Sequence, residues 1–197
     1  MKTVRCAIFT ALRLLTLAVA FTTSLAYADD YSNVSQLLQA GKFNEALVKA
    51  DRFLVAKPRD PQMRFLKGVS QGYSGKTSDA INTFTKLTED YPELPEPYNN
   101  LAVLYAGQNQ FDKARAALET AIRTNPSYAT AHENLGDVYA RLASQSYNKA
   151  LQLDGANTAV PPKLALIHEL LNPGNKGTHP AICPPTPKSP ASAVRAP

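Results

Sequence analysis

A repeat with a period of 34 residues runs through the middle of the chain and constrains the fold more than any other feature. Three prolines follow this spacing, namely Pro58, Pro92 and Pro126. Two further series keep it: Ala46, Ala80 and Ala114, and the small residues Gly68, Ala102 and Gly136. A unit of this length cannot bury its own apolar face, so several units must stack to form a continuous core.

Each unit divides into two amphipathic helical segments joined by a polar turn, such as GQNQFD at 107–112. In residues 95–128, one face of the first segment carries Tyr98, Leu101, Ala102 and Tyr105, and one face of the second carries Ala114, Leu118 and Ala121. The prolines end each second segment. We therefore predict helices at about 31–40, 43–57, 61–74, 77–90, 95–107, 111–124 and 130–154.

This arrangement resembles the tetratricopeptide repeat (TPR) family, whose units of about 34 residues are helical hairpins. Residues 95–128 match the family pattern throughout. Residues 61–94 match at Gly68, Ala80, Phe84 and Pro92 but carry Arg64 and Lys67 where large apolar residues are usual. Residues 27–60 match at Gly41, Ala46 and Pro58. The resemblance implies an all-α TPR superhelix (an α-solenoid) of about three helix pairs.

The fourth unit, 129–155, lacks five residues where the turn should lie, in the stretch YARLASQSYNKALQLD at 139–154. Two structures are compatible with this deletion, a very tight turn or no turn at all. One apolar stripe continues through the junction at helical spacing: His132, Leu135, Gly136, Tyr139, Ala143, Tyr147, Ala150 and Leu153. No Gly or Pro lies between Asp137 and Asp154. We predict one continuous terminal helix, roughly 37 Å long at 1.5 Å per residue.

Such a helix extends beyond the stack and exposes Tyr147, Ala150, Leu151 and Leu153. Two covers are possible and are compatible with each other. The first, which we favour, is a short C-terminal capping helix at 161–171, whose apolar face carries Leu164, Ile167, His168 and Leu171. The second is the same surface of another copy, which would give a symmetric homodimer.

The two ends of the chain differ from the TPR domain at 29–171. Residues 1–28 have a basic start, the apolar run LLTLAVAF and the small-residue site AYA, as in a signal peptide cut near Ala28. We therefore expect a periplasmic or secreted protein with no stable membrane span after cleavage; an uncleaved anchor is the alternative. Residues 172–197 include seven prolines and no acidic residue, which predicts a disordered tail that acts as a tether or a docking segment.

Charge and chemistry exclude several functions. The net charge is +5, but residues 29–171 hold 15 Lys and Arg against 16 Asp and Glu, so we expect no nucleic-acid binding. We interpret His132 and His168 as packing residues, and His179 with Cys183 is too small a set for a metal site. No convergent catalytic group is evident. The sequence predicts no enzyme, no catalytic or metal site and no cofactor.

The resemblance also implies a concave groove formed by the first helix of each unit. The residues at the groove positions are Phe65, Val69, Tyr73, Asn99, Asn100, Val103, Glu133, Asn134, Asp137 and Arg141, with Gln62, Glu96, Tyr31 and Ser35 extending the set. Some relatives hold a carboxylate with groove lysines, which are missing here. Asn100 and Asn134 have two interpretations, because their amides can bind a peptide backbone or tie neighbouring repeats together.

From these features we expect an exported adaptor or scaffold that binds an extended segment or a helix of a partner protein during assembly of an envelope complex. The alternative is a self-associating architectural protein that dimerises through the long helix 130–154 and has no groove ligand.

Overall fold

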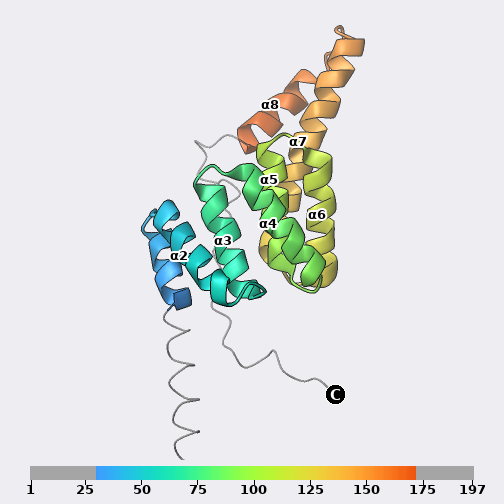
Figure 1. Ribbon diagram of the computed structural model, residues 1–197. Coiled ribbons are helices and arrows are strands. Elements are labelled where there is room, and N and C mark those ends of the chain that lie inside the picture. Colours follow the sequence, from blue (N-terminus) through green and yellow to red (C-terminus); the bar gives the residue numbers. More distant parts are fainter. Residues whose placement is uncertain (1–29, 172–197) are drawn as a thin grey trace, which may run out of the picture.

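Helical hairpins stack side by side along the chain (Figure 1). The computed structural model describes residues 30–171. Residues 30–39 form the first helix. The helices that follow are α2 (Phe43–Ala56), α3 (Pro61–Tyr73), α4 (Thr77–Asp90), α5 (Pro95–Gly107), α6 (Phe111–Thr124), α7 (Ala129–Leu153) and α8 (Pro161–Leu170). The predicted all-α solenoid is confirmed, and the helix ends lie within about one residue of those that the periodicity predicts.

The turn inside each complete unit depends on one residue in the left-handed conformation. Gly41, Gly75 and Asn109 have φ values of 71°, 77° and 58° and follow the 34-residue period. Glycine and asparagine adopt this conformation more readily than other residues. Each therefore allows the chain to reverse from the first helix of a unit to the second.

Three clusters of buried side chains form the core and connect successive units. One joins helix 30–39 to α2 and α3 and includes Val34, Ala50 and Leu66. The second centres on Phe84 and reaches from α3 to α5, and the third centres on Leu118 and reaches from α5 to α7. Neighbouring units thus bury each other's apolar faces, as the repeat requires.

The two departures from the family pattern in the second unit form ion pairs. The Arg64 guanidinium lies 2.5 Å from the Asp90 carboxylate, and Lys67 Nζ lies 2.7 Å from Asp51 Oδ1. Each ion pair links α3 to a neighbouring helix, because Asp90 ends α4 and Asp51 lies in α2. Charged side chains therefore replace apolar packing at these two positions.

Helix α7 is continuous over 25 residues, so the tight turn is wrong and the single long helix is confirmed. No glycine or asparagine lies between Ala140 and Ser146 that could adopt the left-handed turn conformation. The end of α7 extends beyond the stack, with α8 beside it (Figure 1). Helix α8 packs on this part of α7 and buries Leu164, so the predicted cover is present. It is incomplete, because Tyr147, Ala150 and Leu151 are half-buried and Leu153 is 77% exposed.

Two histidines differ from the prediction. His132 and His168 were expected to pack, but both side chains are exposed. A ring nitrogen of His132 lies 3.0 Å from the Pro126 carbonyl oxygen, within hydrogen-bond distance at the entry to α7. Tyr98, the equivalent residue of the third unit, packs against a core cluster that includes side chains of α6, whereas the fourth unit has no second helix folded back beside its first.

The predictions for the two ends of the chain are not tested by the structure. The predicted signal peptide at 1–28 and the predicted disordered tail at 172–197, with His179 and Cys183, lie outside the described residues. Among the helices of residues 30–171, none combines the length and the apolarity needed to cross a bilayer.

Candidate partner-binding groove

The first helices of the four units place equivalent side chains in a row. Ser35, Val69, Val103 and Asp137 recur at 34-residue intervals, on helix 30–39, α3, α5 and α7. Val69 is buried and the other three are half-buried. The row is apolar in the middle and charged at its C-terminal end. We call the surface along it the groove.

At its N-terminal end the groove contains an apolar hollow of about 310 Å³, called here the N-terminal hollow. Its walls come from helix 30–39, the following turn and α3, and its lining residues are Ser35, Leu38, Gln39, Gly41, Phe43, Val69 and Tyr73. The rings of Phe43 and Tyr73 are stacked, with centroids 4.9 Å apart. No carboxylate, amine or guanidinium lines this hollow, so it suits an apolar side chain.

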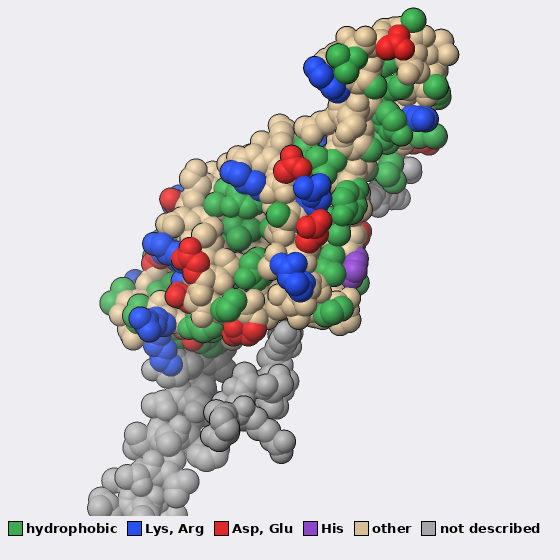
Figure 2. Space-filling model, turned by 90° about the vertical axis from the view of Figure 1, so that its right-hand side faces the viewer, with side chains coloured by type: hydrophobic (Ala, Val, Ile, Leu, Met, Phe, Trp, Pro, Cys, Tyr) green, Lys and Arg blue, Asp and Glu red, His purple; other side chains and the backbone are tan. Residues whose placement is uncertain are grey.

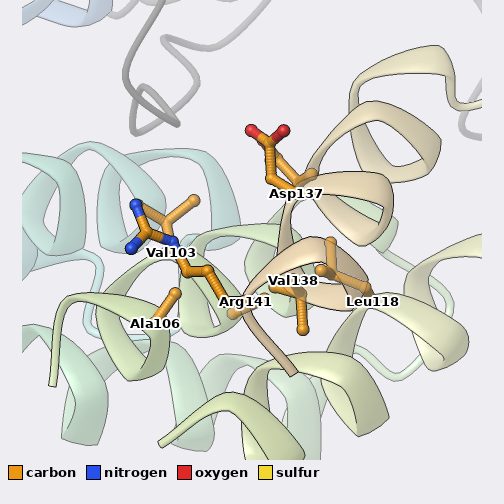
Figure 3. Close-up of a pocket in the computed structure, with 8 residues that line it drawn as sticks. Val103, Ala106, Leu118, Asp137, Val138 and Arg141 are labelled. Carbon is orange, nitrogen blue, oxygen red and sulfur yellow. The ribbon is translucent and has the colours of Figure 1, made fainter. Parts of the chain in front are cut away.

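At the C-terminal end a narrow crevice lies between α5 and α7, and Leu118 of α6 is among its lining residues (Figure 3). We call it the C-terminal crevice. Its volume is about 20 Å³, which is room for about one water molecule. Arg141 extends toward Val103, whereas Asp137 points away from Arg141 (Figure 3). The Arg141 guanidinium carbon lies 5.8 Å from the centre of the Phe111 ring, a cation–π distance.

The charges at this end perturb one carboxyl group. Burial raises the pKa of Asp137 above its ordinary value, the neighbouring Glu133 carboxylate raises it further, and Arg141 opposes both effects. Two carboxyl groups and one guanidinium thus lie at one end of the groove. Elsewhere, basic and acidic side chains are interspersed on the face drawn in Figure 2. The charged end of the groove therefore suits a polar or basic part of a ligand better than an apolar one.

Five of the ten predicted groove residues reach the surface, and these are Tyr73, Val103, Glu133, Asp137 and Arg141. Val69 and Asn134 are buried but still line the N-terminal hollow and the C-terminal crevice. Phe65, Asn99 and Asn100 are also buried and line neither, which corrects the prediction for these three. Phe65 packs edge-on against Phe84 in the core instead. Whether the exposed residues bind a partner stays a prediction.

The asparagines connect units. Asn134 Nδ2 donates a hydrogen bond of 2.8 Å to Asn99 Oδ1, and both side chains are buried. This bond joins α7 to α5 across the interface between the third and fourth units. For Asn134 the geometry therefore supports the interpretation as a tie between repeats.

Four residues that line the N-terminal hollow are absent from the predicted groove set, namely Leu38, Gln39, Gly41 and Phe43. Gly41 was predicted only as a repeat position. Leu38 and Gln39 occupy groove positions of the first unit, and applying the same positions to residues 27–60 would have found them. Phe43 begins α2 and lies outside these positions, so no sequence signal singled it out.

Two sequence models of one family match the chain. Residues 105–143 match the model described as "TPR repeat", and residues 63–93 match the model described as "Tetratricopeptide repeat". Residues 63–93 and 105–143 are therefore tetratricopeptide repeats. The TPR domain-containing protein PYG7, chloroplastic, of Arabidopsis thaliana is 34% identical over 83 residues, which are 40% of this chain and 28% of that protein. The chain spans less than half the length of the first curated TPR relatives that it matches.

Solved structures of TPR proteins share the fold. A thermophilic TPR protein of Thermus thermophilus superimposes with a TM-score of 0.56 and 25% identity, over 74% of this chain and 82% of that one. The type III secretion chaperone SycD of Yersinia enterocolitica, in complex with a peptide of the translocator YopD, gives a TM-score of 0.54 and 17% identity. That match covers 63% of this chain and 95% of SycD.

Proposed function

We propose that this TPR protein is an exported, non-enzymatic adaptor whose groove binds an extended segment or a helix of a partner protein during assembly of an envelope complex. TPR relatives act as scaffolds for protein–protein interaction. The proposal adds the compartment, the binding surface and the kind of ligand.

The observation that carries the proposal is the polarity of the groove. An apolar hollow beside Tyr73 lies at one end, and the Glu133, Asp137 and Arg141 side chains lie at the other. A segment that crosses the first helices would place an apolar side chain in the hollow and a polar or basic one near the carboxyl groups. The SycD chaperone, which has the same fold, is known in complex with a peptide.

Photo-crosslinking in intact cells tests this proposal. A photoreactive amino acid replaces Tyr73 or Val103 in the groove, and, as a matched control, Val55 on α2, which is 85% exposed. We expect one discrete crosslinked partner from the two groove positions and none from Val55. The same pattern from all three positions, or no adduct from the groove, would contradict the proposal. Asn99 and Asn134 are unsuitable test positions because their substitution would weaken the fold.

Export is tested separately at the N-terminus. The basic start and the AYA site predict that the protein purified from its native cells begins at Asp29. Mass spectrometry of the intact protein distinguishes this product from the full chain. A mass that includes residues 1–28 would favour the uncleaved anchor.

A second candidate function is self-association through α7. The observation that favours it is the extension of α7 beyond the stack, with Leu153 77% exposed. Sedimentation equilibrium over a range of concentrations tests it, and a strict monomer would exclude it. One structure of the SycD chaperone is described as an alternative dimer.

A further inference from the structure

Helix α7 consists of two half-repeats arranged end to end. Its first half, residues 129–141, carries the apolar face of the first helix of a TPR unit, with Gly136 at the small-residue position. Its second half, residues 142–153, carries the face of a second helix, with Ala143, Tyr147 and Ala150. In a complete unit these two faces pack against each other.

The second unit shows how close this packing is. A methyl group built on Gly68 of α3 would lie 2.7 Å from the Phe84 ring of α4, so only glycine fits there without a shift. The third unit has Ala102 and Leu118 at the corresponding positions, both buried in one cluster. A larger side chain on the second helix thus accompanies a smaller residue on the first.

In α7 neither the face of residues 129–141 nor the face of residues 142–153 packs against a second helix of the same unit. A methyl group built on Gly136 would meet nothing within 4 Å among the described residues, apart from the adjacent backbone of its own helix. Tyr139 on the same face is 49% exposed. Ala143, Tyr147 and Ala150 are half-buried, whereas the corresponding residues of the second and third units are fully buried.

Helix α8 covers the second half of α7 only in part, because Ala143, Tyr147 and Ala150 stay half-buried and Leu153 is exposed. In the complete units a second helix lies between the first helix of its own unit and that of the next, as α4 lies between α3 and α5. Helix α8 lies beside this half of α7, with Lys163 Nζ 5.4 Å from the centre of the Tyr147 ring. Helix α4 packs on α3, the first helix of its own unit, whereas the second half of α7 has no such partner in the chain because α7 does not fold back.

The two open faces complement each other but cannot meet within one chain. Gly136 and Tyr147 repeat the combination of glycine and aromatic residue seen at Gly68 and Phe84. They lie 11 residues apart on one straight helix, a separation of roughly 16 Å at 1.5 Å per residue. A second copy of the chain can bring a Tyr147 to this Gly136.

We propose that two copies pair through antiparallel α7 helices and reciprocally complete each other's fourth unit. Gly136 of the first copy then lies opposite Tyr147 of the second. The two-fold axis passes between Arg141 and Leu142, so Tyr147 of the first copy lies opposite Gly136 of the second. One symmetry operation thus satisfies both faces, as an isologous dimer requires. In each half of the dimer the fourth unit is then a helix pair, with α8 of the other copy as its cap. The Arg141 side chain does not obstruct the paired face, because it extends toward Val103 on the groove side (Figure 3).

The proposal rests on the second candidate function and makes no use of the groove. Sedimentation equilibrium of the full chain tests it with Gly136→Gln and the control Gly107→Gln, because neither glycine has a neighbour in the monomer. We expect a dimer for the wild type. Gly136→Gln should raise its dissociation constant by about tenfold or more, because overpacking occurs at both ends of the interface. Gly107→Gln should leave it unchanged.

A second variant restores the turn. Insertion of the pentapeptide GQNQF between Ala140 and Arg141 reproduces the spacing of the third unit, so each chain can close its own hairpin. We expect a helical monomer by sedimentation and circular dichroism. A monomeric wild type would refute self-association and the reciprocal pairing together. A dimer that neither Gly136→Gln nor the insertion weakens would leave self-association standing and overturn the pairing.

Discussion

The second and fourth units of this protein have similar sequence patterns and opposite surroundings. Gly68 in the second unit lies against the Phe84 ring, and Gly136 in the fourth occupies the same place in the repeat with open space beside it. The difference between them is the turn, which is present around Gly75 and missing after Tyr139. The burial of a repeat position therefore depends on chain reversal as much as on its own residue type.

The difference in burial between the second and fourth units affects how much each contributes to stability. Apolar surface contributes to stability only where it leaves water, at roughly 25 cal/mol per Å². Phe84 is fully buried, whereas Tyr147 is half-buried. The fourth unit is therefore expected to contribute less to the stability of a monomer than the second, although the two patterns agree.

The largest expected difference concerns the aromatic residues. Phe84→Ala should lower the free energy of unfolding by about 3–5 kcal/mol, because it opens a cavity in the core. Tyr147→Ala should lower it by about 1 kcal/mol, because half-exposed surface is lost and no cavity forms. Urea denaturation of both variants, at concentrations where the protein is monomeric, measures this difference. Equal losses would show that the fourth unit is packed as tightly as the second.

The next comparison substitutes the two glycines. Gly68→Ala should destabilise the fold by about 1–3 kcal/mol, because the new methyl group overlaps the buried Phe84 ring. Gly136→Ala should stabilise the monomer by about 0.5–1 kcal/mol, because alanine restricts the unfolded chain and favours a helix. Thermal unfolding of dilute samples separates the two effects by their sign. A destabilised Gly136→Ala monomer would mean that a neighbour occupies the open face.

The junction between the units gives a third test. Asn134→Ala should cost about 1–3 kcal/mol, because it removes the 2.8 Å hydrogen bond and leaves buried Asn99 Oδ1 without its donor. The control is Asn82→Ala, an exposed residue of α4, which should change stability by less than about 0.5 kcal/mol. Chemical denaturation measures both variants. If the two behave alike, the asparagine pair does not hold the fourth unit.

The smallest effect is electrostatic and specific to the fourth unit. The pKa of Asp137 in the folded chain lies above its ordinary value of 3.8, mainly because of burial. Its protonation therefore favours the folded state. The stability that protonated Asp137 contributes is fully present at a pH below its ordinary pKa. It is lost as the pH rises through the raised pKa of the folded chain. As the pH rises through this range, the stability of Asp137→Asn should increase relative to that of the wild type. The increase should be small, because solvent screens a half-buried group.

A series of urea denaturations between about pH 3 and pH 7 measures this gain. A stability difference between Asp137→Asn and the wild type that falls as the pH rises would contradict the assignment of burial as the dominant cause.

Most of the fold could be predicted from the sequence, whereas much of the groove could not. Helix ends follow from local signals, such as Gly41 in the left-handed region and the proline at the start of α3. Phe65 and Asn99 occupy groove positions in the repeat, yet their side chains are buried. Their exposure depends on how closely adjacent first helices approach, and a single unit contains no information about that distance.

By itself the sequence determined the period, the helical hairpins and the uninterrupted α7, because these depend on spacing and on backbone preferences within a few residues. The tertiary structure decided which of the repeated positions are buried. Arg64 and Lys67 replace apolar residues because Asp90 and Asp51 lie within reach on other helices. Gly136 is open because the helix that should cover it continues in a straight line. Both outcomes depend on the partner that each side chain meets, which is fixed only when the units pack together.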